Sequence, residues 1–114
     1  MRVIRGAINI ENNKTILIKK ATEQLINKIV NNEELEEKQF FSIIVSVTKD
    51  ITKLNPCTVI RKMGYTDTAL MGVQEMDIEN SLPLTIRILI HAEGSNSTKF
   101  YYLRDTKKLR SQFG

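Results

Sequence analysis

The feature that most constrains the fold of this chain is a run of β-branched and aromatic residues, FFSIIVSV, at positions 40–47. Such side chains pack well on a pleated surface, and a strand buried on both faces reads as a nearly continuous apolar run. The run therefore predicts a buried strand at the centre of a sheet. A second run, LTIRILIHA at 84–92, places its isoleucines on one face and predicts another strand of the same sheet.

The other predicted elements complete a mixed α+β domain. Apolar residues recur at helical spacing over 14–30, with Asn12 or Asn13 as a candidate N-cap. Asn55 followed by Pro56 is a second helix-start signal and predicts a short helix. We therefore expect a mixed sheet of about five strands with one long and one short helix. The three remaining strands show short alternating patterns and are expected at 2–10, 68–74 and 99–104.

Length and composition narrow the class of protein. With 114 residues, 41% hydrophobic and 26% charged, residues 1–114 are expected to form one folded domain. The segment 105–114 shows no periodicity and is predicted to be a flexible C-terminal tail. The sequence lacks a signal peptide and an apolar run of the roughly 18 residues that span a membrane, so we expect a cytoplasmic protein with no membrane partner. A single cysteine, Cys57, excludes an internal disulfide.

The net charge of +4 does not describe a generally basic surface. Most of the excess lies between Arg104 and Arg110, in the C-terminal stretch. A nucleic-acid partner is therefore not expected, since that function needs a basic patch over the body of the domain. We expect no metal either, because Glu75 and Asp77 have no further ligand nearby and the chain has a single histidine, His91.

Arg87 is the residue that fits its surroundings least. It lies inside an apolar strand, on the face opposite Ile86 and Ile88, and its guanidinium must find an anion there. One interpretation is an internal ion pair with Glu75 or Asp77, and the other is a ligand-binding arginine. The sequence alone leaves both open.

Two further arginines share this property on separate elements. Arg5 lies in the first predicted strand and Arg61 in the short helix, each among apolar neighbours. A guanidinium captures a carboxylate with two parallel hydrogen bonds, so Arg5, Arg61 and Arg87 together suit a small polyanion. Sequence spacing does not show that the three converge. The Tyr102 hydroxyl is a further candidate for a ligand contact.

Together these segments resemble the monofunctional AroH-class chorismate mutases over nearly the whole chain. The resemblance is carried by I-R-G-A at 4–7, P-x-x-x-x-R at 56–61, V-Q-E-M-D at 73–77, I-R at 86–87 and Y-L at 102–103. It implies the conversion of chorismate to prephenate on the route to phenylalanine and tyrosine, without cofactor or metal. It also implies a homotrimeric pseudo α/β barrel, with sheets inside, helices outside and active sites between subunits.

The resemblance also implies roles for individual residues. Arg87 would donate to the ether oxygen of the substrate, and Glu75 would accept from its ring hydroxyl. Arg5 and Tyr102 would hold the carboxylate of the enolpyruvyl side chain. Arg61 would hold the ring carboxylate or border the cleft.

Several expected substrate contacts depart from the family pattern. Asn55 replaces an aromatic residue, Thr58 replaces a lysine, and Gly72 stands where the family has a cysteine. Cys57, in the same short helix, is included among the predicted substrate-binding residues. Arg110, in the basic tail, is expected to fold over the bound dianion.

Two other functions remain open from the sequence. One is a trimeric imine deaminase-like protein, which also places an arginine between subunits. The other is a noncatalytic carboxylate-binding module that binds chorismate or prephenate without turnover.

Overall fold

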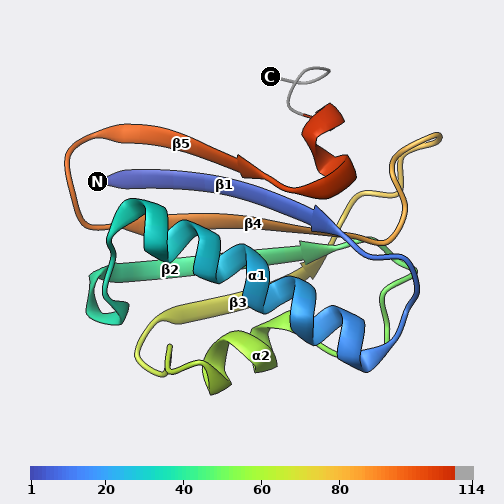
Figure 1. Ribbon diagram of the computed structural model, residues 1–114, viewed down its shortest axis with the longest axis horizontal. Helices are drawn as coiled ribbons and strands as arrows, with labels where there is room; N and C mark the ends of the chain where they lie inside the picture. The colour runs from blue at the N-terminus through green and yellow to red at the C-terminus, as the bar shows by residue number, and fades with distance from the viewer. Residues whose placement is uncertain (110–114) are drawn as a thin grey trace.

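The fold was analysed in a computed structural model that describes residues 1–109. Five strands form one sheet in the order β3-β2-β4-β1-β5 (Figure 1). The pairs β1–β4 and β2–β4 are antiparallel, whereas β1–β5 and β2–β3 are parallel. The elements are β1 (Arg2–Asn9), α1 (Thr15–Glu33), the 3-10 turn η1 (Glu37–Gln39), β2 (Phe40–Val47), α2 (Pro56–Lys62), β3 (Ala69–Gln74), β4 (Thr85–Ala92), β5 (Ser97–Tyr102) and η2 (Arg104–Thr106).

This arrangement confirms the predicted α+β class. The β-branched run at 40–47 forms β2, an interior strand, while the middle position belongs to β4. β4 lies between β1 and β2 and pairs antiparallel with each of them. In the described part of the chain, no helix is long and apolar enough to cross a membrane.

The core lies on one face of the sheet, which we call the helix face. α1 crosses this face (Figure 1), and α2 packs beside α1 and β3. Alternate positions of each strand point toward the helices, and isoleucine is the commonest residue at these positions. The residues below 2% exposure in this core include Ile4, Ile8, Ile18, Leu25, Ile26, Ile29, Ile43, Val45, Ile60, Ile86 and Ile90.

The opposite face of the sheet, which we call the open face, is left uncovered by α1 and α2. Strand register places cross-strand partners on the same face, so one row runs from Val73 through Ser46, Arg87 and Ala7 to Tyr102. Large apolar side chains of this face reach solvent: Met71 is 59% exposed and Val73 43%. Its other members include Arg5, Ile44, Leu89 and Phe100.

The start of α1 corrects the predicted N-cap. The cap position is Lys14, whose side chain makes no capping hydrogen bond. The Asn13 Oδ1 atom instead accepts from the backbone N–H groups of Thr52 (3.0 Å) and Lys53 (3.3 Å). Asn13 therefore ties the segment before the helix to a distant loop, a partner that local sequence does not reveal.

The end of α1 also lies beyond the predicted boundary of 30, at Glu33. The Arg2 side chain donates to the Glu33 carbonyl at 2.7 Å, and the Tyr101 hydroxyl donates to the Glu33 carboxylate. The Arg2 contact satisfies a backbone carbonyl at the helix end, and the Tyr101 contact holds the Glu33 side chain beside it. Glu34 then ends the helix in the left-handed conformation, with φ at 53°.

The last strand occupies 97–102 instead of the predicted 99–104. The register of β5 with β1 runs from Ser97 opposite Arg2 to Tyr102 opposite Ala7. β5 therefore begins opposite the first residue of β1. The predicted tail starts with ordered structure. Residues 104–106 form a 3-10 turn, the Thr106 hydroxyl donates to the Ala7 carbonyl at 2.9 Å, and Leu109 is buried.

Candidate active site

Arg87 occupies the middle of the open face, near the start of β4. Ile86 and Ile88 on either side of it point into the core, as the alternation predicted. Its cross-strand partners are Ser46 on β2 and Ala7 on β1. The Arg87 side chain keeps 31% of its surface exposed, so a strong hydrogen-bond donor is fixed on the strand and still reachable from outside.

Glu75 reaches Arg87 from the end of β3. The Glu75 backbone N–H donates to the Val47 carbonyl at 2.8 Å, which fixes the residue beside β2. The Glu75 Oε2 atom accepts from the Ser46 hydroxyl and lies 3.5 Å from the Arg87 Nε atom. The predicted ion pair of Arg87 is therefore confirmed, with Glu75 as its partner.

This pair leaves hydrogen-bonding capacity unused. Within the described residues, the Arg87 Nε atom is buried and has no hydrogen-bond partner. Buried donors are almost always paired, and an unpaired one calls for an explanation such as a catalytic role. The geometry is thus compatible with both earlier interpretations, since Arg87 pairs with Glu75 and retains donors for a ligand.

Asp77, the other candidate partner of Arg87, lies elsewhere. β3 ends at Gln74, and Asp77 belongs to the loop that follows. Its carboxylate pairs with the Lys49 ammonium at 2.8 Å, and the hydrogen bond with Asp77 raises the pKa of Lys49. Glu75 and Asp77 therefore do not form a pair of carboxylates. Among residues 1–109, no group of three or more metal-ligating side chains is present.

Arg5 and Tyr102 lie on the same open face, on β1 and β5. Arg5 pairs across the strands with Leu89 and Phe100, and its guanidinium lies over the Phe100 ring, 5.8 Å from the centroid. The Tyr102 ring packs edge-on against Phe100 with centroids 6.4 Å apart. Phe100 thus orients both predicted ligand-binding side chains. Within the described residues, Arg5 makes no ion pair, so its charge is available to an anion.

A pocket of about 510 Å³ opens beside Arg87 and Glu75. The loop at 75–83 forms one wall, and Lys108 and Leu109 contribute to the lining. Two cationic side chains, Arg87 and Lys108, therefore border it. Arg110 lies just outside the described residues, so its predicted closure over a ligand stays a prediction.

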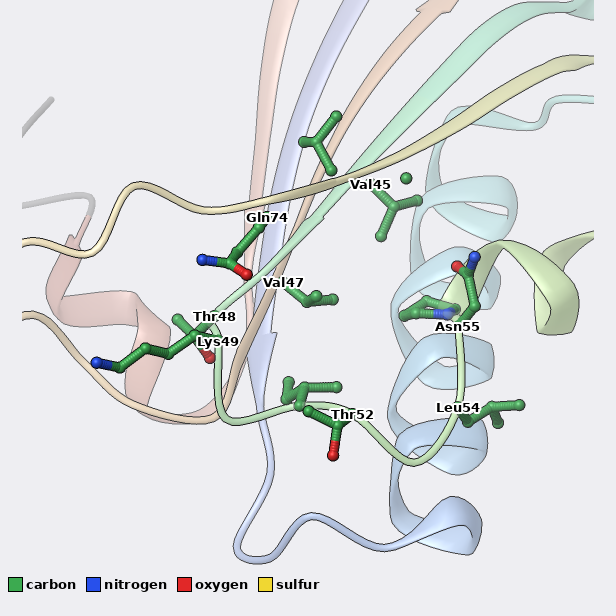
Figure 2. Close-up of a pocket in the computed structure, with 12 residues that line it drawn as sticks. Val45, Val47, Thr48, Lys49, Thr52, Leu54, Asn55 and Gln74 are labelled. Atoms are coloured by element: carbon green, nitrogen blue, oxygen red, sulfur yellow. The ribbon is translucent and has the colours of Figure 1, made fainter.

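A second group of predicted site residues lies around α2. Asn55 caps this helix, as predicted, because its Oδ1 atom accepts from the Cys57 backbone N–H at 2.9 Å. Asn55 and Gly72 line a pocket of about 330 Å³, and Figure 2 shows Asn55 on one side of it with Lys49 and Gln74 on the other. A Cβ atom on Gly72 would lie 3.4 Å from both Asn55 Oδ1 and Cys57 Sγ.

The three other members of this group differ in accessibility. Cys57 is 4% exposed, and burial raises the pKa of its thiol while the nearby positive charge of Arg61 opposes the shift. Thr58 is half-buried, and Arg61 is exposed near the end of α2. Arg61 therefore offers a solvent-facing cation, whereas Cys57 behaves as a core side chain.

The two groups do not meet within one copy of the chain. Arg5, Glu75, Arg87 and Tyr102 belong to the open face, whereas α2 with Asn55 and Arg61 packs on the helix face. The sheet separates them. The predicted site residues therefore form two separate groups on opposite faces of the sheet, each with its own cations.

Ser46 is the site residue that the sequence analysis missed. Its hydroxyl holds Glu75, although it lies inside an apolar run. The available signal was its even spacing from Ser42, which places both hydroxyls on one face of β2, away from Ile43 and Val45. The identity of its partner requires the fold.

Known proteins are similar to this chain in sequence and in fold. The chain matches the family model "Chorismate mutase type I" over residues 1–113. It is 29% identical over 114 residues to a chorismate mutase AroH of Thermus thermophilus, covering 96% of this chain and 93% of that protein. It is 28% identical over 91 residues to the Bacillus subtilis (strain 168) chorismate mutase AroH, covering 79% and 72%. A solved chorismate mutase structure from Clostridium thermocellum aligns with a TM-score of 0.88 at 35% identity, covering 93% of this chain and 97% of that one.

Proposed function

The chain belongs to the chorismate mutase type I family and is an isomerase that converts chorismate to prephenate, and we propose that it does so in a cleft built by two copies of the chain. The observation that carries this proposal is the division of the site. Arg87 and Glu75 lie on the open face, and Arg61 and Asn55 lie with α2 on the helix face. Neither half alone surrounds a dianion.

The chemistry requires no proton transfer and no nucleophile. In the rearrangement an ether C–O bond breaks while a C–C bond forms through a chair-like transition state within one molecule. The protein must hold the flexible substrate in its folded conformer and stabilise the charge that separates as the ether bond lengthens. Fixed arginines and one carboxylate supply both functions.

Arg87 is the proposed catalytic donor to the ether oxygen. Negative charge develops on this oxygen only as the bond breaks, so a guanidinium there favours the transition state over the bound substrate. The exposed part of the Arg87 side chain supports this role. Glu75, beside it, accepts from the ring hydroxyl and faces the ring carbons as they become electron-poor.

The remaining cations hold the two carboxylates of the substrate. Arg5, with Tyr102 at the next row of the open face, binds the carboxylate of the enolpyruvyl side chain. Arg61 from a neighbouring copy binds the ring carboxylate or borders the cleft. Asn55, Thr58 and Gly72 contribute the α2 side of the same cleft, with the buried Cys57 behind them, and Arg110 covers it.

The apolar part of the open face supports assembly into a homotrimer with sheets inside and helices outside. Met71 and Val73 are largely exposed, and Ile44 and Leu89 are half-exposed beside them. Contiguous exposed apolar surface of this kind marks an interaction site. We infer that packing of open faces against one another buries these side chains, and that α2, which packs beside the edge strand β3, borders the neighbouring copy at that edge.

The direct test follows the loss of chorismate absorbance, with prephenate confirmed by its acid conversion to phenylpyruvate. We expect turnover by the wild type and a loss of at least about 10²-fold in kcat for Arg87→Ala, the size found when a preorganised donor is removed. Arg87→Lys retains the charge without the planar fork and is expected to restore only part of the rate. Wild-type turnover by Arg87→Ala would refute the role of Arg87, and binding of chorismate without any turnover would favour a noncatalytic module.

A further inference from the structure

We propose that Ser46 is a positioning residue for the Glu75 carboxylate, holding it so that both Glu75 and Arg87 keep groups free for the substrate. This inference rests on the proposed function and adds to it a residue that does not itself touch the substrate. It begins from the hydrogen bond between the Ser46 hydroxyl and Glu75 Oε2.

Strand register fixes Ser46 in place relative to Arg87. The two residues are direct cross-strand partners on β2 and β4, so their side chains stand side by side on the open face. Glu75 follows the neighbouring strand β3, and its backbone is held to Val47, the residue after Ser46, at 2.8 Å. The Glu75 carboxylate thus has a backbone anchor and a side-chain anchor, both on β2.

The bond to Ser46 affects how the Glu75 carboxylate meets the Arg87 guanidinium. An unrestrained arginine and carboxylate favour a bidentate pair, in which two N–H groups meet two oxygens. Here the contact joins the Glu75 Oε2 atom to the Arg87 Nε atom at 3.5 Å, and the same oxygen accepts from Ser46. The bond to Ser46 therefore keeps the pair from closing.

Two sets of groups remain available as a result. Within residues 1–109, the Glu75 Oε1 atom accepts no hydrogen bond, and the terminal nitrogens of Arg87 donate none. In the proposed mechanism these are the acceptor for the ring hydroxyl and the donors for the ether oxygen. Ser46 contributes by excluding the arrangement in which the two catalytic side chains satisfy each other.

The test compares two variants of equal shape, Ser46→Thr and Ser46→Val, in the full-length chain. Both are β-branched and suit a strand, and only threonine keeps the hydroxyl. We expect Ser46→Thr to stay within about threefold of wild-type kcat, and Ser46→Val to lose about tenfold, the effect of roughly one hydrogen bond. KM is expected to change less than about twofold, since Ser46 does not contact the substrate.

A second readout separates positioning from a purely structural role. In a Glu75→Ala background the difference between Thr and Val at position 46 is expected to disappear, because no acceptor for the hydroxyl remains at position 75. Ser42→Ala is the matched control. Ser42 lies on the same strand and face but bonds to His91 at 3.0 Å, and its loss is expected to leave kcat unchanged.

The outcomes distinguish this inference from the proposed function. Equal kcat values for Ser46→Thr and Ser46→Val, with wild type active and Arg87→Ala inactive, overturn the role of Ser46 alone. An inactive wild type overturns the proposed site itself. Urea unfolding of each variant guards against misfolding, and Ser46→Ala replaces the valine variant if valine prevents folding, with the same tenfold loss expected.

Discussion

The two faces of the sheet use the same strands for different purposes. On β4, Ile86, Ile88 and Ile90 are at most 5% exposed on the helix face, whereas Arg87 on the open face keeps 31% of its side chain exposed. Neighbours one residue apart along the strand therefore belong to different environments. The difference teaches that stability resides on the face that the helices cover, whereas the open face leaves polar and apolar side chains accessible for the contacts proposed above.

The largest difference between the two faces is expected in the stability of variants at two neighbouring positions on β1. Ile4→Ala removes a fully buried side chain from the helix face, and we expect it to lower the free energy of unfolding by about 2–5 kcal/mol. Arg5→Ala, on the open face, is expected to cost less than about 1 kcal/mol but to raise KM strongly. Urea unfolding and chorismate kinetics on both variants check the contrast. Equal losses of stability would mean that the faces do not differ as described.

The next prediction concerns assembly. Met71→Glu places a charge on the exposed apolar part of the open face, and we expect it to dissociate the proposed homotrimer, as measured by sedimentation. Ile16→Glu is the control, since Ile16 is 51% exposed on α1, close to the 59% of Met71. Dissociation by Ile16→Glu, with none by Met71→Glu, would place the interface on the helices.

A smaller effect is expected at Gly72, on the α2 side. The added Cβ of Gly72→Ala meets Asn55 and Cys57 at ordinary contact distances of 3.4 Å, so the protein accommodates it. The loss of glycine freedom in the unfolded chain should stabilise the fold by roughly 0.4–1 kcal/mol. Because the methyl group enters the pocket beside Asn55, KM is expected to change a few-fold while kcat is retained. A large fall in kcat would show that Gly72 affects chemistry.

The smallest effect concerns pH and the helix face. Burial and the hydrogen bond to the Glu33 carboxylate raise the pKa of Tyr101 from 10.0 to about 12. The folded state therefore favours the neutral phenol. Its contribution to stability is complete below pH 10 and is lost as the pH rises toward 12. Tyr101→Phe should flatten the decline between these pH values in urea unfolding, and an unchanged decline would contradict the assignment.

The sequence pattern within single segments predicted much of this architecture, because strand alternation and helix capping depend on residues close together in the chain. Alternation in 84–92 separated Arg87 from the core isoleucines, and Asn55 before Pro56 marked the start of α2, which the capping bond to Cys57 explains. An ion pair of Arg87 with Glu75 or Asp77 was one of two interpretations of the sequence, because an arginine in an apolar strand requires an anion, and the fold selects Glu75.

The remaining features depend on partners far apart in sequence. Asn13 bonds to the backbone at Thr52 and does not cap α1, and α1 extends to Glu33 because Arg2 and Tyr101 bind its end. The Ser46 hydroxyl meets a carboxylate 29 residues away. Such contacts follow from strand order, which no local pattern specifies.

The most direct test of the account mixes two inactive variants, one for each half of the cleft. Arg87→Ala removes the open-face donor, and Arg61→Glu reverses the charge on α2. If each cleft draws Arg87 from one copy and Arg61 from the next, random assembly of equal amounts restores about one quarter of the sites. We therefore predict that co-expression recovers about a quarter of wild-type turnover on chorismate. A mixture no more active than the separate variants would contradict a cleft shared between copies.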